Sequence, residues 1–247
     1  MKIEYEIIDK EKGIVRKTTL DERWYGGLTE NEKDFWWKPS VTWIASYYPK
    51  GAEYMRYIAN KGWDESERIK NEAGDRGTIV HHAIQKGMED GKLLIGDKIK
   101  DREGVDREMT PDEYYCALTF KQWWESVGKP KPVAIERTVI SQEDDFAGTL
   151  DYLFEDGLLL DIKTSKDIWP SHELQLSSLK KAALENGLDV KKIAILQVGY
   201  TRNKNQHYKF TEIEDQYNLF LSAKTFWKKE NNGSKPFQRD YPLEIIF

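Results

Sequence analysis

The chain contains a single cysteine, Cys116, among its 247 residues, and this scarcity excludes several classes of protein. One thiol cannot form a disulfide within the chain. It also cannot supply the thiolates of an iron–sulfur cluster or of a cysteine-rich zinc site. A chain without such crosslinks depends on its hydrophobic core, and 247 residues are enough to build a substantial one.

Long apolar runs are also missing. No stretch approaches 18 consecutive apolar residues, so no membrane-spanning helix is expected. The opening stretch MKIEYEIIDKEKG lacks the apolar segment of a signal peptide, and we therefore expect a cytoplasmic protein. A charged content of 33% beside a hydrophobic content of 39% is typical of a globular domain.

The chain has no excess of basic residues, because 38 lysines and arginines face 43 acidic residues for a net charge of −5. A nucleic-acid-binding protein usually carries a basic footprint, so the overall balance argues mildly against one. A local basic groove around an acidic centre stays compatible with this charge. Carboxylates can hold metal ions, and those ions attract phosphate.

Hydrophobic periodicity and turn residues predict the organisation of the chain. Helices are expected at 51–61, 65–90, 111–127, 171–186 and 213–230. Strands are expected at 131–140, 145–154, 158–166, 191–200 and 206–213. A hairpin is expected from 2–8 and 13–19, an irregular aromatic segment at 20–50 and a loop at 91–110. This order predicts an α/β or α+β fold with a central mixed sheet flanked by helices.

The stretch LLLDIKTSK at 158–166 is typical of a buried strand, yet it carries Asp161 and Lys163. The turn before it, Glu155–Gly157, decides what faces these charges. A two-residue loop would place Asp151 on the opposite face. A three-residue loop with a left-handed Gly157 would place Asp151 directly across from Asp161, with Lys163 on the same face.

Two facing carboxylates repel each other, and a bound divalent cation would remove that penalty. Mg²⁺ binds hard oxygen ligands, often one or two carboxylates together with phosphate and water. A nearby lysine would hold a phosphate oxygen or the attacking water. This combination is suited to metal-assisted hydrolysis of a phosphodiester. The alternative is an ordinary surface hairpin with a cross-strand Asp–Lys pair.

Five motif elements stand in an order that resembles the RecB-like branch of the PD-(D/E)XK nuclease superfamily. They are the histidine of DRGTIVHHAIQKG, the glutamate of VAIERTVI, the G-x-x-D and D-x-K motifs, and a following helical glutamine: His81, Glu136, Gly148 with Asp151, Asp161 with Lys163, and Gln175. The resemblance covers roughly 75–180. One departure is Leu179, which stands where the family pattern has tyrosine after the glutamine. That departure weakens the assignment of Gln175.

The resemblance implies a restriction-endonuclease-like core with N-terminal helical and hairpin additions. It implies a single nuclease domain over 1–247, with core motifs at 75–200, an accessory region at 1–60 and a C-terminal helix at 213–230. Asp151 and Asp161 would bind one or two Mg²⁺ or Mn²⁺ ions, with His81 and Glu136 completing the shell. Lys163 would position water or stabilise phosphorane charge, and the catalytic Gln175 would orient Lys163 or the substrate.

Polar residues around these motifs are candidate DNA contacts. The family pattern suggests backbone contacts after the D-x-K motif, at Thr164, Ser165 and Lys166. Further candidate phosphate contacts are the basic residues Lys180, Lys181, Lys191, Lys192, Arg202, Lys204, Lys228 and Lys229. A solvated surface is the alternative for each of them.

The function implied is a stand-alone phage-type exonuclease that degrades DNA to 5′-phosphate products, since no G-x-x-x-x-G-K-[ST] helicase motif is present. A single-strand annealing or recombination protein would be a natural partner, and a DNA-threading homo-oligomer stays open. Three alternatives also stay open. They are an endonuclease of the same superfamily, a binding module that lost catalysis, and an enzyme that acts on RNA.

Overall fold

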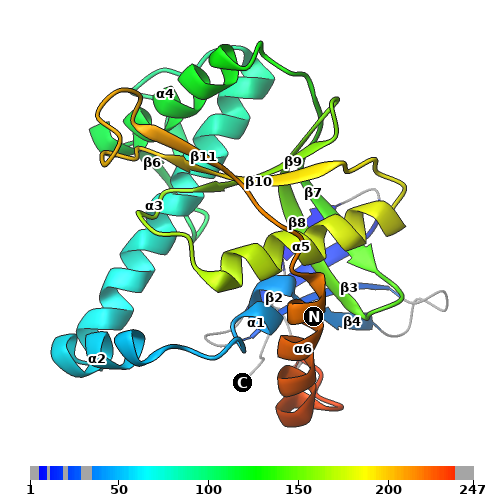
Figure 1. Cartoon of the computed structure of the whole chain (residues 1–247). Helices are drawn as coiled ribbons and strands as arrows, with labels where there is room; N and C mark the ends of the chain where they lie inside the picture. Colours follow the sequence, from blue (N-terminus) through cyan, green and yellow to red (C-terminus); the bar gives the residue numbers. More distant parts are fainter. Residues whose placement is uncertain (1–5, 10–11, 19–21, 29–34, 237–247) are drawn as a thin grey trace, which may run out of the picture.

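The centre of the computed structural model is a five-stranded mixed sheet, and the structure describes residues 6–9, 12–18, 22–28 and 35–236 (Figure 1). The strands follow the order β11-β10-β9-β8-β7. Their bounds are Pro132–Ser141 for β7, Phe146–Phe154 for β8, Leu158–Lys163 for β9, Lys192–Val198 for β10 and Tyr208–Glu212 for β11. Only β9 and β10 pair in parallel, so the predicted mixed sheet is confirmed.

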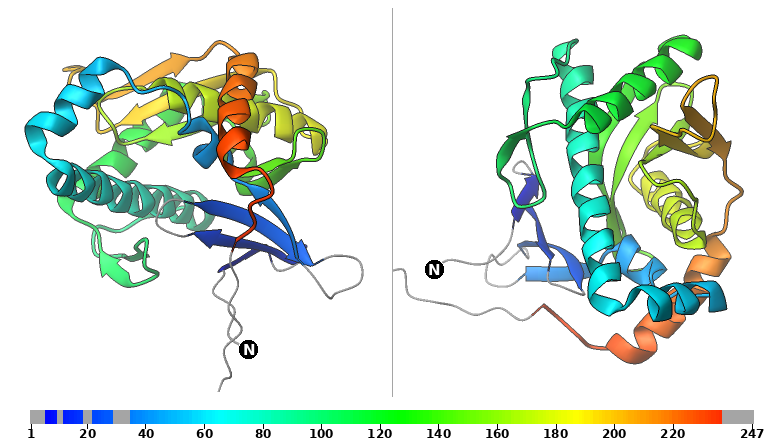
Figure 2. Two further views of the ribbon diagram at one scale, coloured as in Figure 1. Left: turned by 90° about the horizontal axis from the view of Figure 1, so that it is seen from below. Right: turned by 90° about the vertical axis from the view of Figure 1, so that its left-hand side faces the viewer.

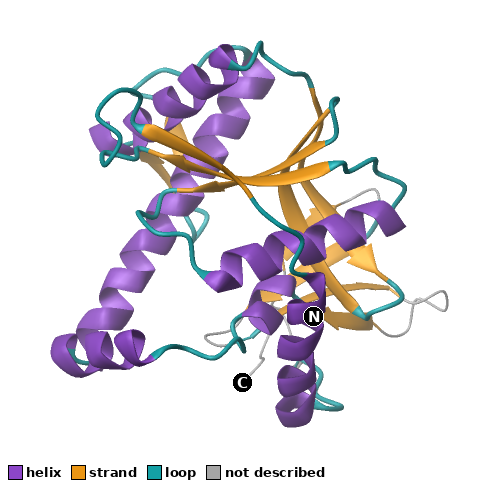
Figure 3. Cartoon of the chain, in the orientation of Figure 1, coloured by secondary structure: helices purple, strands orange, loops and turns teal. Residues whose placement is uncertain are grey.

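Helices cover both faces of this sheet (Figure 3). On one face lie α3 (Trp63–Asp90) and α4 (Pro111–Ser126). On the other lie α1 (Val41–Ala45), α5 (Pro170–Glu185) and α6 (Tyr217–Asn231). A strand covered on both sides needs apolar residues at successive positions, which explains the leucine run at the start of β9.

The remaining helix, α2 (Ala52–Lys61), precedes α3. Figure 2 shows α3 as a long helix along one side of the sheet. None of the helices in the described ranges has the length and apolar character needed to cross a bilayer.

A second, antiparallel sheet precedes the core, with the order β1-β2-β3-β4. Its strands are Glu6–Asp9, Ile14–Thr18, Arg23–Leu28 and Phe35–Pro39. The predicted hairpin around Gly13 is confirmed by β1 and β2 where it is described, while 2–5 and 19 lie outside the described residues. The predicted irregular segment at 20–50 is wrong, because it contains β3, β4 and α1.

Glycines on β3 that lie across from tryptophans on β4 explain why the sequence pattern does not predict these two strands. Gly26 and Gly27 lie across from Trp37 and Trp36. A Cβ atom on Gly26 would lie 2.6 Å from the Trp37 ring, and one on Gly27 would lie 2.8 Å from the Trp36 ring. The tryptophan rings cover the glycines, so these strands lack the alternation of β-branched residues that usually marks a strand.

Four smaller boundaries also differ from prediction. The expected loop at 91–110 contains the short hairpin of β5 (Lys98–Lys100) and β6 (Asp106–Glu108). Strand β9 ends at Lys163, so 164–166 belong to a loop, and α6 begins at Tyr217 rather than 213. Helix α5 begins at Pro170 with Trp169 as its N-cap, rather than Ser171, because proline is well suited to the first helical position.

The glycine of the G-x-x-D motif has a packing role. Gly148 lies on β8 where the strand approaches α1 and α5. A Cβ atom at this position would lie 2.7 Å from Val41 of α1 and 2.7 Å from Leu179 of α5. The absence of a side chain therefore brings β8, and Asp151 further along it, close to both helices.

We expect Gly148→Ala to lower the free energy of unfolding by about 1–3 kcal/mol, since the added methyl group overpacks this contact. The measurement is urea unfolding followed by tryptophan fluorescence. Gly77→Ala in α3 is the matched control, because its Cβ would meet nothing within 4 Å. That control should gain about 0.5–1 kcal/mol from helix propensity. Equal stability of Gly148→Ala and the parent would contradict the packing argument.

Candidate metal centre

The turn between β8 and β9 has three residues. Tyr152 pairs with Leu160 and Leu153 with Leu159, which leaves Glu155–Gly157 as the loop. Gly157 has a φ of +83°, a conformation that glycine adopts without strain. Of the two loop lengths that the sequence left open, the structure has the three-residue loop. The same register, continued by one step, places Asp151 opposite Asp161.

Strands β8 and β9 separate at Asp151 and Asp161. Beyond this point, side chains replace β8 as hydrogen-bond partners of the β9 backbone. On its other side, β9 pairs with β10 along its whole length. Toward β8, the backbone N–H of Ile162 donates to Asp151 Oδ2 at 2.7 Å. The Ile162 carbonyl lies 3.0 Å from His81 Nε2, which must donate to it. Asp151 and His81 thus satisfy backbone groups that a neighbouring strand would otherwise bind.

Glu136 lies on β7 next to the same point. Ile135 pairs with Tyr152 and Arg137 with Leu150, so Glu136 stands opposite Asp151. Its φ of +44° is a left-handed conformation that costs a non-glycine residue about 1 kcal/mol or more. Three adjacent strands therefore contribute three acids to one row across the sheet. The strained backbone of Glu136 therefore lies within this row of acids.

His81 reaches this row from α3. Its Nδ1 lies 3.3 Å from Glu136 Oε1 and 3.6 Å from Asp151 Oδ2. Because Nε2 donates to a carbonyl, Nδ1 is the nitrogen whose lone pair is available when the ring is neutral. Ligand atoms of His81, Glu136 and Asp151 all lie within 4.8 Å of one another. A histidine fixed through its other nitrogen is the usual arrangement for a metal ligand.

Charge shifts the protonation of this group. Burial disfavours the His81 imidazolium, but the carboxylates of Asp151 and Glu136 outweigh burial and raise the pKa of His81 to about 9. Burial also raises the pKa of Asp151. At neutral pH the metal-free protein therefore holds a proton at Nδ1, in the space between two carboxylates. A bound cation would replace that proton.

Asp161 forms an ion pair with Lys163. The lysine Nζ lies 2.8 Å from Oδ1 and 2.6 Å from Oδ2, and Asp161 is only 2% exposed. Burial works against the ammonium, but the carboxylates of Asp161 and Asp151 outweigh it and raise the pKa of Lys163. Asp161 thus lies beside Lys163 and outside the group formed by His81, Glu136 and Asp151. Its role as a metal ligand stays a prediction.

The charge of the site fits a divalent cation. Ionised Glu136, Asp151 and Asp161 carry three negative charges and Lys163 carries one positive charge. With neutral His81, this set has a charge of −2. Carboxylate oxygens with one imidazole can hold a divalent cation, whereas the single cysteine excludes an iron–sulfur cluster.

The remaining predicted residues lie around this centre and differ in their burial and in their hydrogen-bond partners. Gln175 is half-buried on α5, one turn after His172. In the loop after β9, the Thr164 carbonyl accepts from Arg76 at 3.1 Å and the Ser165 hydroxyl donates to the Asp167 carbonyl at 2.9 Å.

The predicted cations fall into two groups. Lys166 is exposed. Lys180 and Lys181 instead form ion pairs with Asp215 at 2.8 Å and Glu143 at 2.6 Å. Their role as DNA contacts stays a prediction, and binding phosphate would require breaking these pairs.

Two residues of this region were not anticipated. Arg76 ties α3 to the loop after β9. Gln197, which is 1% exposed, pairs with Lys163 across β9 and β10, and its Nε2 donates to the Ser165 carbonyl at 2.9 Å. The one signal in the sequence was a lone amide in the apolar run KIAILQV. Both residues fix the loop that follows the D-x-K motif.

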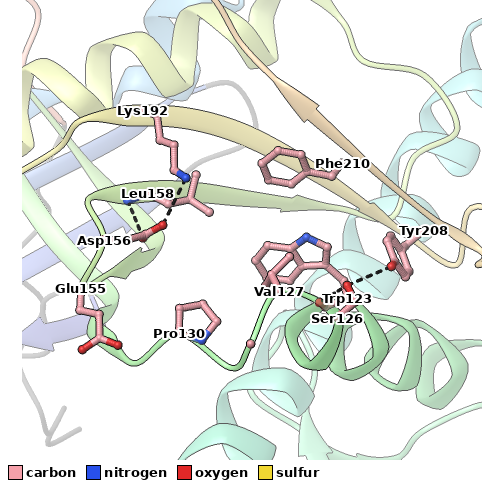
Figure 4. A pocket seen from close by; sticks show the side chains of 11 residues that line it. Trp123, Ser126, Val127, Pro130, Glu155, Asp156, Leu158, Lys192, Tyr208 and Phe210 are labelled. Atoms are coloured by element: carbon pink, nitrogen blue, oxygen red, sulfur yellow. Dashed lines mark hydrogen bonds and ion pairs between the residues drawn. The ribbon is translucent and has the colours of Figure 1, made fainter.

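A pocket of about 600 Å³ lies at the opposite end of β9, beside the β8–β9 turn (Figure 4). Trp123, Tyr208 and Phe210 supply aromatic walls, and the Asp156–Lys192 ion pair lies near Leu158. None of the candidate metal ligands lines this pocket. The candidate centre therefore lies at the separated strands rather than in this hollow.

A comparison with protein-family models finds no match for the chain, and a comparison with curated proteins finds none either. The resemblance to RecB-like nucleases accordingly depends on the motif residues themselves and on the geometry that joins them.

His172 provides a pH test of the region. Its Nδ1 accepts the Trp169 backbone N–H at 3.3 Å, and burial together with the Lys163 ammonium lowers its pKa to about 4. A lowered histidine pKa stabilises the fold above the unfolded pKa of about 6.5, and this stability is lost as pH falls toward 4. From pH 7 to pH 5 this loss amounts to as much as about 2 kcal/mol.

We therefore expect His172→Gln, which keeps a hydrogen-bond acceptor at this position, to lose less stability than the parent between pH 7 and pH 5. Urea unfolding at both pH values measures the difference. Parallel losses in the two proteins would show that His172 is not held neutral by its surroundings.

Proposed function

We propose that the chain is a metal-dependent deoxyribonuclease of the RecB-like PD-(D/E)XK type, acting as an exonuclease that leaves 5′-phosphate ends. The observation that carries the proposal is the row of acids on β7, β8 and β9, with Glu136 half-buried and Asp151 and Asp161 buried, with His81 above it and the Lys163–Asp161 pair beside it. This set has the charge and the ligand atoms for Mg²⁺ or Mn²⁺ next to a fixed ammonium.

Each residue has a distinct task in hydrolysis. A bound divalent cation would supply Lewis-acid charge to the phosphate and activate a water molecule. His81 Nδ1, Glu136 and Asp151 would hold that ion. Asp161 fixes the Lys163 ammonium and keeps it charged, so Lys163 acts as an electrostatic stabiliser of phosphoryl oxygens rather than as a base. Gln175, approaching from α5, would orient Lys163 or the substrate backbone.

The energetic cost of burying charged side chains argues against a binding module that has lost catalysis. Buried carboxylates are expensive unless they are paired or bound to metal. A protein that only binds DNA has no need for three mutually repelling carboxylates, so the presence of Glu136, Asp151 and Asp161 together with Lys163 favours a catalytic site. The choice of exonuclease over endonuclease rests on the resemblance. The same resemblance suggests that the protein acts in DNA recombination in the cytoplasm, with an annealing protein as its partner.

The test is degradation of linear duplex DNA with Mg²⁺, Mn²⁺ or EDTA, run beside a covalently closed circle. We expect loss of the linear DNA alone, in either metal and not in EDTA. Lys163→Ala should slow the reaction by about a hundredfold or more, because a preorganised charge is removed. Lys92→Ala, at an exposed position in the loop after α3, is the control and should retain full activity.

Other results would revise the proposal in defined ways. Nicking of the circle would identify an endonuclease. Cleavage of RNA in preference to DNA would change the substrate. Stable binding of DNA without cleavage in any metal would favour the non-catalytic module.

A further inference from the structure

The cations around the sheet differ in whether a carboxylate already neutralises them. Four lysines near α5 and the start of β10 form ion pairs: Lys180 with Asp215, Lys181 with Glu143, Lys191 with Asp189 and Lys192 with Asp156. By contrast, 199–211 contains Arg202, Lys204 and Lys209 and no acidic residue. Arg202 pairs with Asp167, but Lys204 and Lys209 have no carboxylate partner in the described part of the chain.

Strand register places Lys209 on the same row as the candidate catalytic lysine. Gln197 pairs with Lys163 of β9 on one side and with Lys209 of β11 on the other. The row crosses two strand spacings, so the two lysine Cα atoms are roughly 10 Å apart.

Both lysines also face the same side of the sheet. Phe210 stacks on Trp123 of α4, and the Tyr208 hydroxyl lies 3.2 Å from Ser126 of α4. Side chains alternate along a strand, so Lys209 lies on the face away from α4. Ile162 packs on the α3–α4 side, which leaves Lys163 on this opposite face as well.

The segment that carries these cations is held in place at both ends. The Gly199 N–H donates to Thr119 Oγ1 at 2.9 Å, and the Tyr115 hydroxyl bonds to His207 Nδ1. Arg202 reaches Asp167 at 2.7 Å, which joins the segment to the loop after Lys163. A fixed segment loses little conformational freedom when a ligand binds.

We propose that the β10–β11 segment, through Lys204 and Lys209, binds the sugar-phosphate backbone of the DNA as it passes from Lys163 over the loop after β9 toward β11. This inference rests on the proposed nuclease function and adds the path of the substrate. Cations that no carboxylate neutralises, on a protein of net charge −5, are where a polyanion would be attracted; the Lys209 ammonium lies over the Tyr200 ring, 5.8 Å from its centroid. Gln197, between the two lysines, supports the loop that leads to this surface.

The experiment measures binding of a fluorescein-labelled DNA duplex by fluorescence anisotropy at several salt concentrations. All proteins are full-length and carry Lys163→Ala, so that the duplex stays intact. Lys204→Ala with Lys209→Ala removes the two contacts. The matched control is Lys92→Ala with Lys98→Ala. Both lysines are exposed: Lys92 lies in the loop after α3, and Lys98 is the first residue of β5, which packs next to α3. Circular dichroism melting confirms that each variant is folded.

We expect Kd to rise by at least about tenfold at 0.1 M salt in the Lys204/Lys209 variant, and the log–log salt slope to fall by about 2. Affinity and slope equal to those of the Lys92/Lys98 control would overturn the proposed path while leaving the nuclease function intact. Failure of the folded Lys163→Ala parent itself to bind DNA would instead contradict the proposed function.

Discussion

Repulsion among three neighbouring carboxylates is the constraint on which this molecule is built. Glu136, Asp151 and Asp161 occupy one row on three adjacent strands, where like charges destabilise a sheet. The metal-free protein offsets this repulsion with the His81 imidazolium and the Lys163 ammonium, which leaves one negative charge in excess. The raised pKa values of His81 and Lys163 express that need for positive charge.

The backbone around the row is arranged to keep these charges in place. The strands β8 and β9 separate at Asp151, and Glu136 takes a left-handed conformation beside it. The open edge of β9 is completed by Asp151 and His81 through the N–H and carbonyl of Ile162. Replacing either side chain therefore removes a candidate metal ligand and also exposes an unpaired backbone group. The geometry of the candidate site and the local fold depend on the same hydrogen bonds.

Much of this centre could be predicted from the sequence because short-range rules fix it. Side-chain alternation and Gly157 set the hairpin register, and that register places Asp151 against Asp161. The left-handed Glu136 could not be predicted, since the side chain itself does not favour that conformation. Strands β3 and β4 were missed because tryptophan rings across from glycines replace the usual strand pattern.

Long-range partners were equally inaccessible. The carboxylates that bind Lys180 and Lys181 lie far away in sequence. The row from Lys163 to Lys209 depends on the parallel pairing of β9 with β10 and on the antiparallel pairing of β10 with β11. A local pattern contains neither register, so Lys209 becomes notable only once the sheet is formed.

The most direct measurement of the central claim is an anomalous difference map from a crystal of the full chain grown with Mn²⁺. We expect one strong peak at about 2–2.4 Å from His81 Nδ1 and from carboxylate oxygens of Glu136 and Asp151, with Lys163 still paired to Asp161. A map without a peak at this row, or with Mn²⁺ bound only elsewhere, would contradict the role of these acids as a metal centre.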